Sequence, residues 1–379
     1  MRVLLLILFL TSFLYTDKKA DDISKIDKNM SVKQTKTDNI TWLNPQNKPF
    51  KILGLNWIHK NQLYRRLPLT GDIKIPTGVD RLANHTAGGQ LHFSSNSKRI
   101  LIKVKTTPYR PMYHMPQTAQ AGFDIYIERD GVKKFAGISK MKAGQQEFSS
   151  QLYYNYTEEL QTYTINFPLY NGIQSLEIGI DKGSLVTAPP PFKNPKPIVV
   201  YGTSITQGAC ASRPGMAYTN ILSRLLQQEV INLGFSGSGK GEPELAQLIS
   251  NINNKSLVIL DIECNTHESL RKVLKPFIQE LRTFSPTLPI LILSRIPLAR
   301  DLNPANVSKR ESLKDFQENL VNDLTKGGDQ NLYFLNGLEL IKGKWAHEAT
   351  VDGTHATDLG FMMMAENLEP HVRKILNQP

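Results

Sequence analysis

Residues 198–208 read IVVYGTSITQG, and this segment opens the second half of the chain. Four apolar residues at 198–201 are typical of a short buried strand, and the small residues after them predict a turn into a helix. Similar apolar runs recur at 230–233, 257–261, 290–294 and 332–336. Helical patterns lie between and after these runs, at 218–228, 242–252, 268–284, 310–324 and 357–376. This alternation predicts a five-stranded parallel sheet covered by helices on both faces.

The preceding part of the chain has a different hydrophobic pattern. Short alternating runs, such as ILIKVK at 100–105 and LEIGI at 176–180, are separated by turn residues such as Arg129-Asp130-Gly131. Runs of this length predict antiparallel strands, and no window between 50 and 185 has a convincing helical period. We therefore expect an all-β sandwich over residues 46–186.

Proline separates the two regions. Residues 187–197 read TAPPPFKNPKP, with five prolines in eleven residues, which predicts a stiff linker without regular structure. The α/β domain then covers residues 198–379. Residues 21–45 are polar and are expected to form a loose leader ahead of the sandwich.

The first residues are typical of a secretory signal peptide. Met1-Arg2 is followed by an apolar run over Val3–Leu14, which is too short to span a bilayer, and Ala20 is a candidate cleavage site. We expect residues 1–20 to be removed on export to the periplasm or beyond, and no membrane insertion of the mature protein.

The positive charge is unevenly distributed. The net charge is +11, made up of +12 in residues 1–196 and −1 in residues 197–379. A solvated basic surface explains this asymmetry, and attraction to an acidic polymer is the alternative. Nucleic acid is not an expected partner, because the chain has no recognisable binding motif. Oligomeric state is left open.

Three residues have the chemistry of a nucleophilic triad. Ser204 follows the first buried strand and precedes a helix, which exposes its hydroxyl at the sheet edge. Asp352 lies three residues before His355, and an acid so placed can hold the imidazole in one tautomer as a base. Taken alone, the Ser204 turn also suits a phosphate or plain packing, and Asp352 suits a helix cap. Their positions at strand ends of one domain favour the triad.

Two further residues suit an oxyanion hole. Gly237 follows the second strand and Asn265 follows the third. Acyl transfer needs donors aimed at the oxygen that becomes negative, and the backbone N–H groups of Ser204 and Gly237 with the Asn265 amide can supply them. A simple turn at Gly237 and a cap at Asn265 are the structural alternatives.

The segments that contain Ser204, Gly237, Asn265 and the Asp352–His355 pair, in this order along the chain, resemble the four conserved blocks of the SGNH/GDSL hydrolases. Thr203 stands where many members have Asp, and Glu263-Cys264-Asn265-Thr266 replaces the usual G-x-N-D block. The sandwich resembles the N-terminal domain of a bacterial subgroup with a G-x-D-L-Y signature, here Gly122–Tyr126 with Ile for Leu. The resemblance implies a flavodoxin-like three-layer hydrolase domain, a jelly-roll-like sandwich and carbohydrate esterase activity.

The predicted activity is hydrolysis of short acyl esters, above all acetyl esters, on saccharides, with no metal or organic cofactor. His355 takes the proton of Ser204, whose oxygen attacks the ester, and water resolves the acyl-enzyme. An acyltransferase using the same triad is the first alternative, and a non-catalytic polysaccharide-binding protein is the second.

Other residues are candidates for the surroundings of the site. Possible substrate contacts, against the alternative of simple packing, are Glu263, His114, His267 and Arg295. The two cysteines, Cys210 and Cys264, follow strands whose ends converge at one sheet edge, so an exported protein could join them in a disulfide; two free thiols are the alternative.

Overall fold

The computed structural model describes residues 23–27, 30–69 and 73–378. The predicted signal peptide at 1–20, with its candidate cleavage site, lies outside the described residues. Residues 1–34 and 35–379 form separate units, and the first contains the short helix α1 (Ile23–Ile26). No helix in the described ranges is long and apolar enough to cross a membrane.

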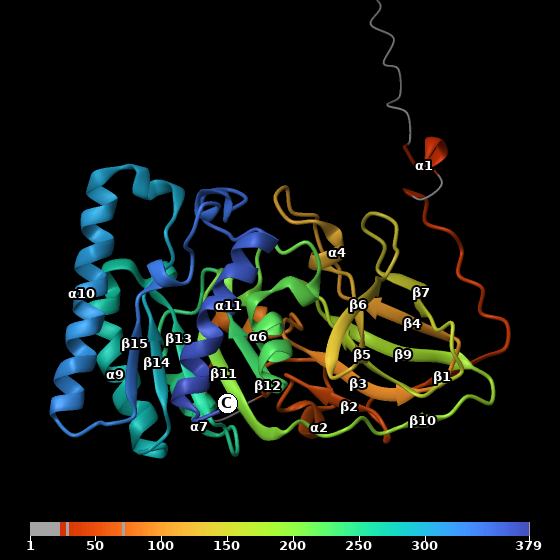
Figure 1. The fold of residues 1–379 in the computed structure, drawn as a ribbon, viewed down its shortest axis with the longest axis horizontal. Coiled ribbons are helices and arrows are strands. Elements are labelled where there is room, and N and C mark those ends of the chain that lie inside the picture. Colours follow the sequence, from red (N-terminus) through yellow and green to blue (C-terminus); the bar gives the residue numbers. More distant parts are fainter. Residues whose placement is uncertain (1–22, 28–29, 70–72, 379) are drawn as a thin grey trace, which may run out of the picture. The chain divides into compact units, whose positions relative to one another are not determined.

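A two-sheet sandwich forms the first part of residues 35–379 (Figure 1). One antiparallel sheet has the order β1-β9-β4-β7 and the other β10-β3-β8-β5-β6, with β2 added beside β3. The strands are β1 (Ile40–Leu43), β2 (Lys51–Leu53), β3 (Gln90–Ser95), β4 (Arg99–Thr106), β5 (Asp124–Arg129), β6 (Val132–Ile138), β7 (Glu147–Tyr154), β8 (Gln161–Asn166), β9 (Ile173–Asp181) and β10 (Val186–Thr187).

Apolar side chains from the inner faces of both sheets, among them Phe93, Ile102 and Ile178, fill the space between them. The alternation of buried and exposed residues along β4 and β7 is the pattern that the sequence predicts for strands packed on one face. The sandwich begins earlier than expected, because β1 pairs with β9 and lies inside the segment 21–45 that was predicted as a polar leader.

Three short helices interrupt the sandwich, where the sequence predicts none: α2 (Ile58–Asn61), α3 (Thr77–Leu82) and α4 (Gln117–Gln120). They are too short for a helical period to be read from sequence. Val79 and Leu82 of α3 are buried in the core of the α/β region, as is Ala119 of α4 on its opposite face. The two regions therefore share apolar cores.

The second part of the chain is the predicted α/β layer structure. Its five strands are all parallel, in the order β12-β11-β13-β14-β15, which is the flavodoxin-like order. The elements are β11 (Asn194–Gly202), α5 (Ser204–Gln207), α6 (Tyr218–Leu226), β12 (Gln228–Gly234), α7 (Pro243–Ser250), β13 (Leu257–Asp261), α8 (Glu263–Thr266), α9 (Leu270–Phe284), β14 (Ile290–Leu293), α10 (Pro304–Lys326), β15 (Leu332–Leu335) and α11 (Asp358–Ile375).

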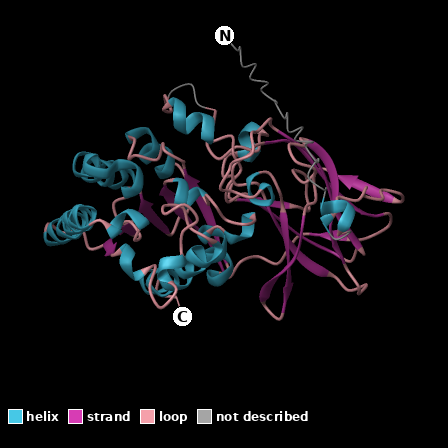
Figure 2. Ribbon diagram, turned by 90° about the horizontal axis from the view of Figure 1, so that it is seen from above, coloured by secondary structure: helices cyan, strands magenta, loops and turns pink. Residues whose placement is uncertain are grey.

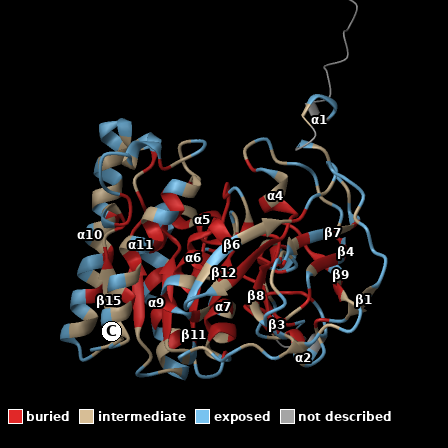
Figure 3. Ribbon diagram, turned by 45° about the vertical axis from the view of Figure 1, so that its right-hand side comes forward, coloured by how far each residue is buried: buried red, intermediate tan, exposed pale blue. Residues whose placement is uncertain are grey.

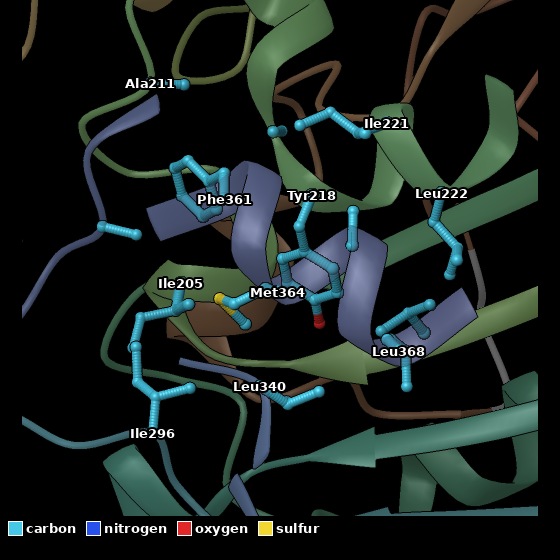
Figure 4. Packing of buried hydrophobic residues seen from close by; sticks show 14 of the residues in the cluster. Ile205, Ala211, Tyr218, Ile221, Leu222, Ile296, Leu340, Phe361, Met364 and Leu368 are labelled. Atoms are coloured by element: carbon cyan, nitrogen blue, oxygen red, sulfur yellow. The ribbon is translucent and has the colours of Figure 1, made fainter. Parts of the chain in front are cut away.

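Helices cover both faces of this sheet (Figure 2). Residues of α6 and α11 pack together on one face, where Tyr218 and Phe361 stack with ring centroids 6.3 Å apart (Figure 4). Helices α7, α9 and α10 contribute to the core on the other face. The strands between them are buried almost completely (Figure 3), which explains their continuous apolar runs.

The proline-rich segment is only partly irregular. Residues 188–193 form no strand or helix, but β11 already begins at Asn194, which pairs with Gln228 of β12. The prediction that residues 187–197 lack regular structure is thus wrong at both ends. Proline is tolerated in β11 because Pro195 and Lys196 lie where the register shifts and the regular ladder with β12 has not yet begun.

Candidate active site

Ser204 lies at the carboxyl end of the first strand of the parallel sheet. Strand β11 ends at Gly202, Thr203 caps the short helix α5 by accepting a hydrogen bond from the Ile205 N–H, and Ser204 is the first helical residue. Gly202 is required here, because a β-carbon would lie 2.1 Å from the Thr206 hydroxyl oxygen. The strand order reverses between β12 and β13 around β11, the place where such folds bind ligands.

The structure brings the three predicted triad residues together. His355 Nε2 lies 3.0 Å from Ser204 Oγ, and His355 Nδ1 lies 2.8 Å from Asp352 Oδ2. These distances allow hydrogen bonds from the hydroxyl to the imidazole and from the imidazole to the carboxylate. The arrangement can move a proton from Ser204 to His355 while Asp352 holds the ring.

The other carboxylate oxygen of Asp352 organises its own loop. Asp352 Oδ1 accepts hydrogen bonds from the backbone N–H groups of Thr354, at 3.0 Å, and His355, at 2.8 Å. The alternative role as a helix cap is taken by Thr357, whose side chain accepts the Gly360 N–H at the start of α11. Asp352 therefore belongs to the loop ahead of the helix.

Electrostatics keeps Asp352 ionised. Partial burial raises the pKa of its carboxyl group, but the hydrogen bonds from the His355 N–H, the His355 ring and the Thr354 N–H outweigh burial and lower the pKa to about 2. A carboxylate that stays charged stabilises the imidazolium that forms when His355 accepts a proton.

The proposed oxyanion donors lie on the two neighbouring loops. Gly237 has a φ of +65°, and a β-carbon there would meet open space. Within the described residues, its N–H donates no hydrogen bond. Asn265 lies on α8, and its amide donates to the carbonyls of Phe235 and Gly239, both at 3.2 Å. Asn265 thus holds the loop that contains Gly237.

Two residues that the sequence analysis missed also hold this loop. Gln207, on the same short helix as Ser204, accepts a hydrogen bond from the Ser236 N–H at 3.0 Å. Arg66 is fully buried and donates to the carbonyls of Asn232, Gly234, Leu82 and His85. Burial lowers the pKa of its guanidinium to about 9. No local pattern reveals Arg66, because its partners in β12 lie more than 160 positions away.

The Asp of the G-x-D-x-Y signature connects the sandwich to the loop behind the nucleophile. Asp124 is fully buried and accepts hydrogen bonds from Arg213 Nη1 at 3.0 Å, the Gly215 N–H at 2.7 Å and Asn166 Nδ2 at 2.7 Å. Tyr126 of the same signature also contacts Arg213. Burial raises the pKa of Asp124, and Arg213 opposes that shift.

Among the candidate substrate contacts, only His114 lies beside the triad. Its Nε2 is 3.9 Å from Asp352 Oδ2, and its ring meets the ring of His355 edge-on with centroids 5.5 Å apart. Glu263, His267 and Arg295 instead line a different cavity of about 230 Å³, whose lining includes none of the triad residues.

Glu263 is part of a buried polar cluster. Its Oε2 accepts hydrogen bonds from the Arg295 N–H and the Gln317 amide, both at 2.8 Å. Arg295 in turn pairs with Asp301. The side chains of Glu263 and Arg295 are almost completely buried, so both are engaged within the protein. His267 has a φ of +47°, an uncommon conformation for a residue with a β-carbon.

The possible disulfide between Cys210 and Cys264 is not formed, and both thiols are free. Cys210 Sγ lies within 4.8 Å of ring nitrogens of His114 and His355. The charged neighbours of Cys264 are instead Asp261, Glu263, Arg295 and Arg300. The two thiols thus have different surroundings, although the strand ends that carry them converge.

His114, Cys210 and His355 are also the one group among the described residues with metal-ligand geometry. Burial raises the pKa of the Cys210 thiol to about 12, which opposes the thiolate that a metal prefers. His355 is already hydrogen-bonded through both ring nitrogens. These residues therefore fit acid–base chemistry better than metal binding.

The fold is that of an α/β hydrolase domain preceded by an antiparallel sandwich. Residues 195–373 match the GDSL-like lipase/acylhydrolase family, and residues 40–186 match the N-terminal domain of SGNH-type esterases. A GDSL-like protein of known structure from Bacteroides ovatus is 32% identical, covering 89% of this chain and 98% of its own, with a TM-score of 0.82. The chain belongs to the SGNH/GDSL hydrolases, as its sequence motifs predicted.

More distant structures share the fold. A salicylyl-acyltransferase from a tetracycline biosynthetic pathway is 18% identical, with a TM-score of 0.68 over 90% of this chain and 98% of its own. A family two carbohydrate esterase from Clostridium thermocellum, solved with cellohexaose, is 14% identical, with a TM-score of 0.56 over 77% and 93%. None of the curated proteins matches this sequence.

Proposed function

We propose that this hydrolase is an exported serine esterase that removes short acyl groups, above all acetyl, from saccharides. The observation that supports the proposal most strongly is the unbroken line of hydrogen-bonding distances from Ser204 Oγ through His355 to Asp352, at 3.0 and 2.8 Å. A binding protein without catalytic activity would not need this geometry.

In the proposed reaction, Ser204 Oγ attacks the ester carbonyl while His355 Nε2 takes its proton. The oxyanion accepts hydrogen bonds from the N–H groups of Ser204 and Gly237 and from Asn265, which exchanges one of its two long bonds to the loop carbonyls for the bond to substrate. His355 then protonates the leaving alcohol, and water attacks the acyl-enzyme by the reverse proton path.

The support for a saccharide substrate is the similarity of this fold to that of carbohydrate esterases. Carbohydrate esterases share the fold across both regions of the chain. Export is supported by the apolar segment near the N-terminus. The salicylyl-acyltransferase that shares this fold favours a second candidate, in which an alcohol replaces water in the last step.

A substrate screen tests the proposal. Purified protein is given acetyl, butyryl, octanoyl and palmitoyl esters, acetylated glycans, and an added alcohol acceptor, and free acid and transfer products are measured. We expect acetate release from acetylated saccharides to exceed the hydrolysis of long-chain esters, and Ser204→Ala to lower kcat by at least about 10⁴-fold. Faster hydrolysis of long-chain esters, or transfer in place of hydrolysis, would overturn the substrate or the reaction type.

A further inference from the structure

The loop between β4 and α4, residues 107–116, is held in place by contacts to α4 and to the α/β region. Met115 is buried, and Met112 packs against the core beneath the nucleophile. The Gln120 side chain accepts the Met112 N–H at 3.2 Å and donates to the Arg110 carbonyl at 2.7 Å. Directly after the loop, the Thr118 hydroxyl donates to the Ser212 carbonyl at 2.6 Å. The position of this loop is therefore set by buried groups.

One residue of this anchored loop, Tyr113, points into solvent. Its side chain is 90% exposed, although Met112 on one side is half-buried and His114 on the other is largely covered. Single exposed aromatic residues are common on protein surfaces and need no explanation by themselves. Here the exposed ring is held on a fixed loop, which sets it apart.

The ring of Tyr113 is also part of a row of rings that ends at the nucleophile. It stacks on His114 with centroids 4.3 Å apart and planes 10° from parallel. His114 meets His355 edge-on at 5.5 Å, and His355 Nε2 lies 3.0 Å from Ser204 Oγ. His114 Nδ1 is buried and has no partner among the described residues. The stacked pair thus borders the space beside the catalytic histidine.

We propose that Tyr113, supported by His114, is the platform on which the sugar ring carrying the ester stacks. A pyranose has one apolar C–H face and a rim of hydroxyl groups, so it can cover the open face of Tyr113 while its hydroxyls remain hydrated. An aromatic ring already held in place loses little conformational freedom on binding, which favours this use. The proposal rests on the esterase function and assigns the alcohol side of its substrate.

The stacking predicts a specific difference between substrates. The acetylated sugar covers Tyr113, whereas ethyl acetate has no ring that could stack on the platform. Loss of the ring should therefore lower the ratio of kcat/KM for an acetylated methyl glucoside to kcat/KM for ethyl acetate, mainly through KM for the sugar.

The test compares Tyr113→Ala, Tyr113→Trp and Tyr156→Ala with the wild-type protein. Tyr156 is the control, because it is similarly exposed, at 86%, and its ring contacts Tyr154 in the sandwich. We expect Tyr113→Ala to lower the ratio roughly tenfold, the size of a modest aromatic contact, with Tyr113→Trp close to wild type. Tyr156→Ala should leave the ratio unchanged.

The outcomes separate this proposal from the proposed function. An unchanged ratio in Tyr113→Ala, or the same loss in Tyr156→Ala, overturns the platform and leaves the esterase standing. Hydrolysis of ethyl acetate without any release of acetate from the glucoside overturns the platform and the saccharide substrate together, and leaves only the esterase activity standing. If the wild-type protein hydrolyses neither ester, the esterase function itself fails, and the platform fails with it.

Discussion

The sandwich and the α/β region each contain a buried aspartate, and the two differ in the groups that surround the carboxylate. Asp124 of the sandwich has a guanidinium partner, Arg213, as well as two amide donors. Asp261, at the end of β13, accepts hydrogen bonds from two hydroxyls alone within the described part of the chain, those of Thr206 at 2.8 Å and Tyr218 at 3.1 Å. The sandwich thus uses an ion-paired aspartate for attachment, whereas Asp261 of the α/β region has no cationic partner among the described residues.

This difference indicates that the two regions have separate roles. All groups of the proposed reaction come from the α/β region, while Arg66, Asp124 and the loop with His114 reach from the sandwich to the loops that carry them. Substitutions of the buried anchors in the sandwich should therefore act on stability, and substitutions of the groups that carry out the proposed reaction should act on the rate.

Asp124→Ala should have the largest effect on stability. Removing one partner of a buried ion pair leaves Arg213 without its partner and costs about 3–5 kcal/mol of unfolding free energy. Glu177→Ala, which breaks the half-exposed Lys103–Glu177 pair in the same sandwich, should cost under about 1 kcal/mol. Urea unfolding measures both. Equal losses in the two variants would refute the special role of Asp124.

Asn265→Ala tests the predicted role of the α/β region in the rate. Loss of an oxyanion donor should lower kcat by roughly 10²–10³-fold, equivalent to about 3–4 kcal/mol in the transition state. Steady-state kinetics on an acetyl ester gives kcat and KM, and unfolding gives the stability. A change confined to KM would instead make Asn265 a residue that only binds substrate.

Asp261→Asn should have a smaller, pH-dependent effect. Burial raises the pKa of Asp261 from 3.8 to about 6, with Thr206 and Tyr218 opposing the shift, so the folded protein favours the protonated form. Stability should therefore fall as pH rises from about 4 to about 6, by roughly 2–3 kcal/mol. The asparagine cannot titrate and should reduce this slope in urea unfolding at pH 4–7. An unchanged slope would show that Asp261 is not its source.

The same separation of roles explains what the sequence could predict. The parallel strands, Ser204 and the Asp352–His355 pair are set by local patterns of a few residues, and the structure places them as expected at one sheet edge. The anchors are not local. Arg66 and Asp124 meet partners in distant parts of the chain, and neither burial nor pairing can be read from their neighbours in sequence.

Two predictions about side chains at strand ends differ from the structure for a related reason. Convergence of strand ends placed Cys210 and Cys264 in one region but could not give the direction of either side chain, so the disulfide was wrong. Glu263, His267 and Arg295 are at strand ends too, yet they surround a cavity apart from the triad. A strand end fixes where a residue lies, and packing decides where its side chain points.

Covalent labelling of the intact protein tests whether Ser204 is the nucleophile. The intact protein is incubated with a serine-directed phosphonate ester, and its mass is measured before and after digestion. We predict one adduct for each chain, on the peptide that contains Ser204, and no adduct in Ser204→Ala. An adduct on another residue, or an active wild-type protein that acquires none, would show that Ser204 is not the nucleophile.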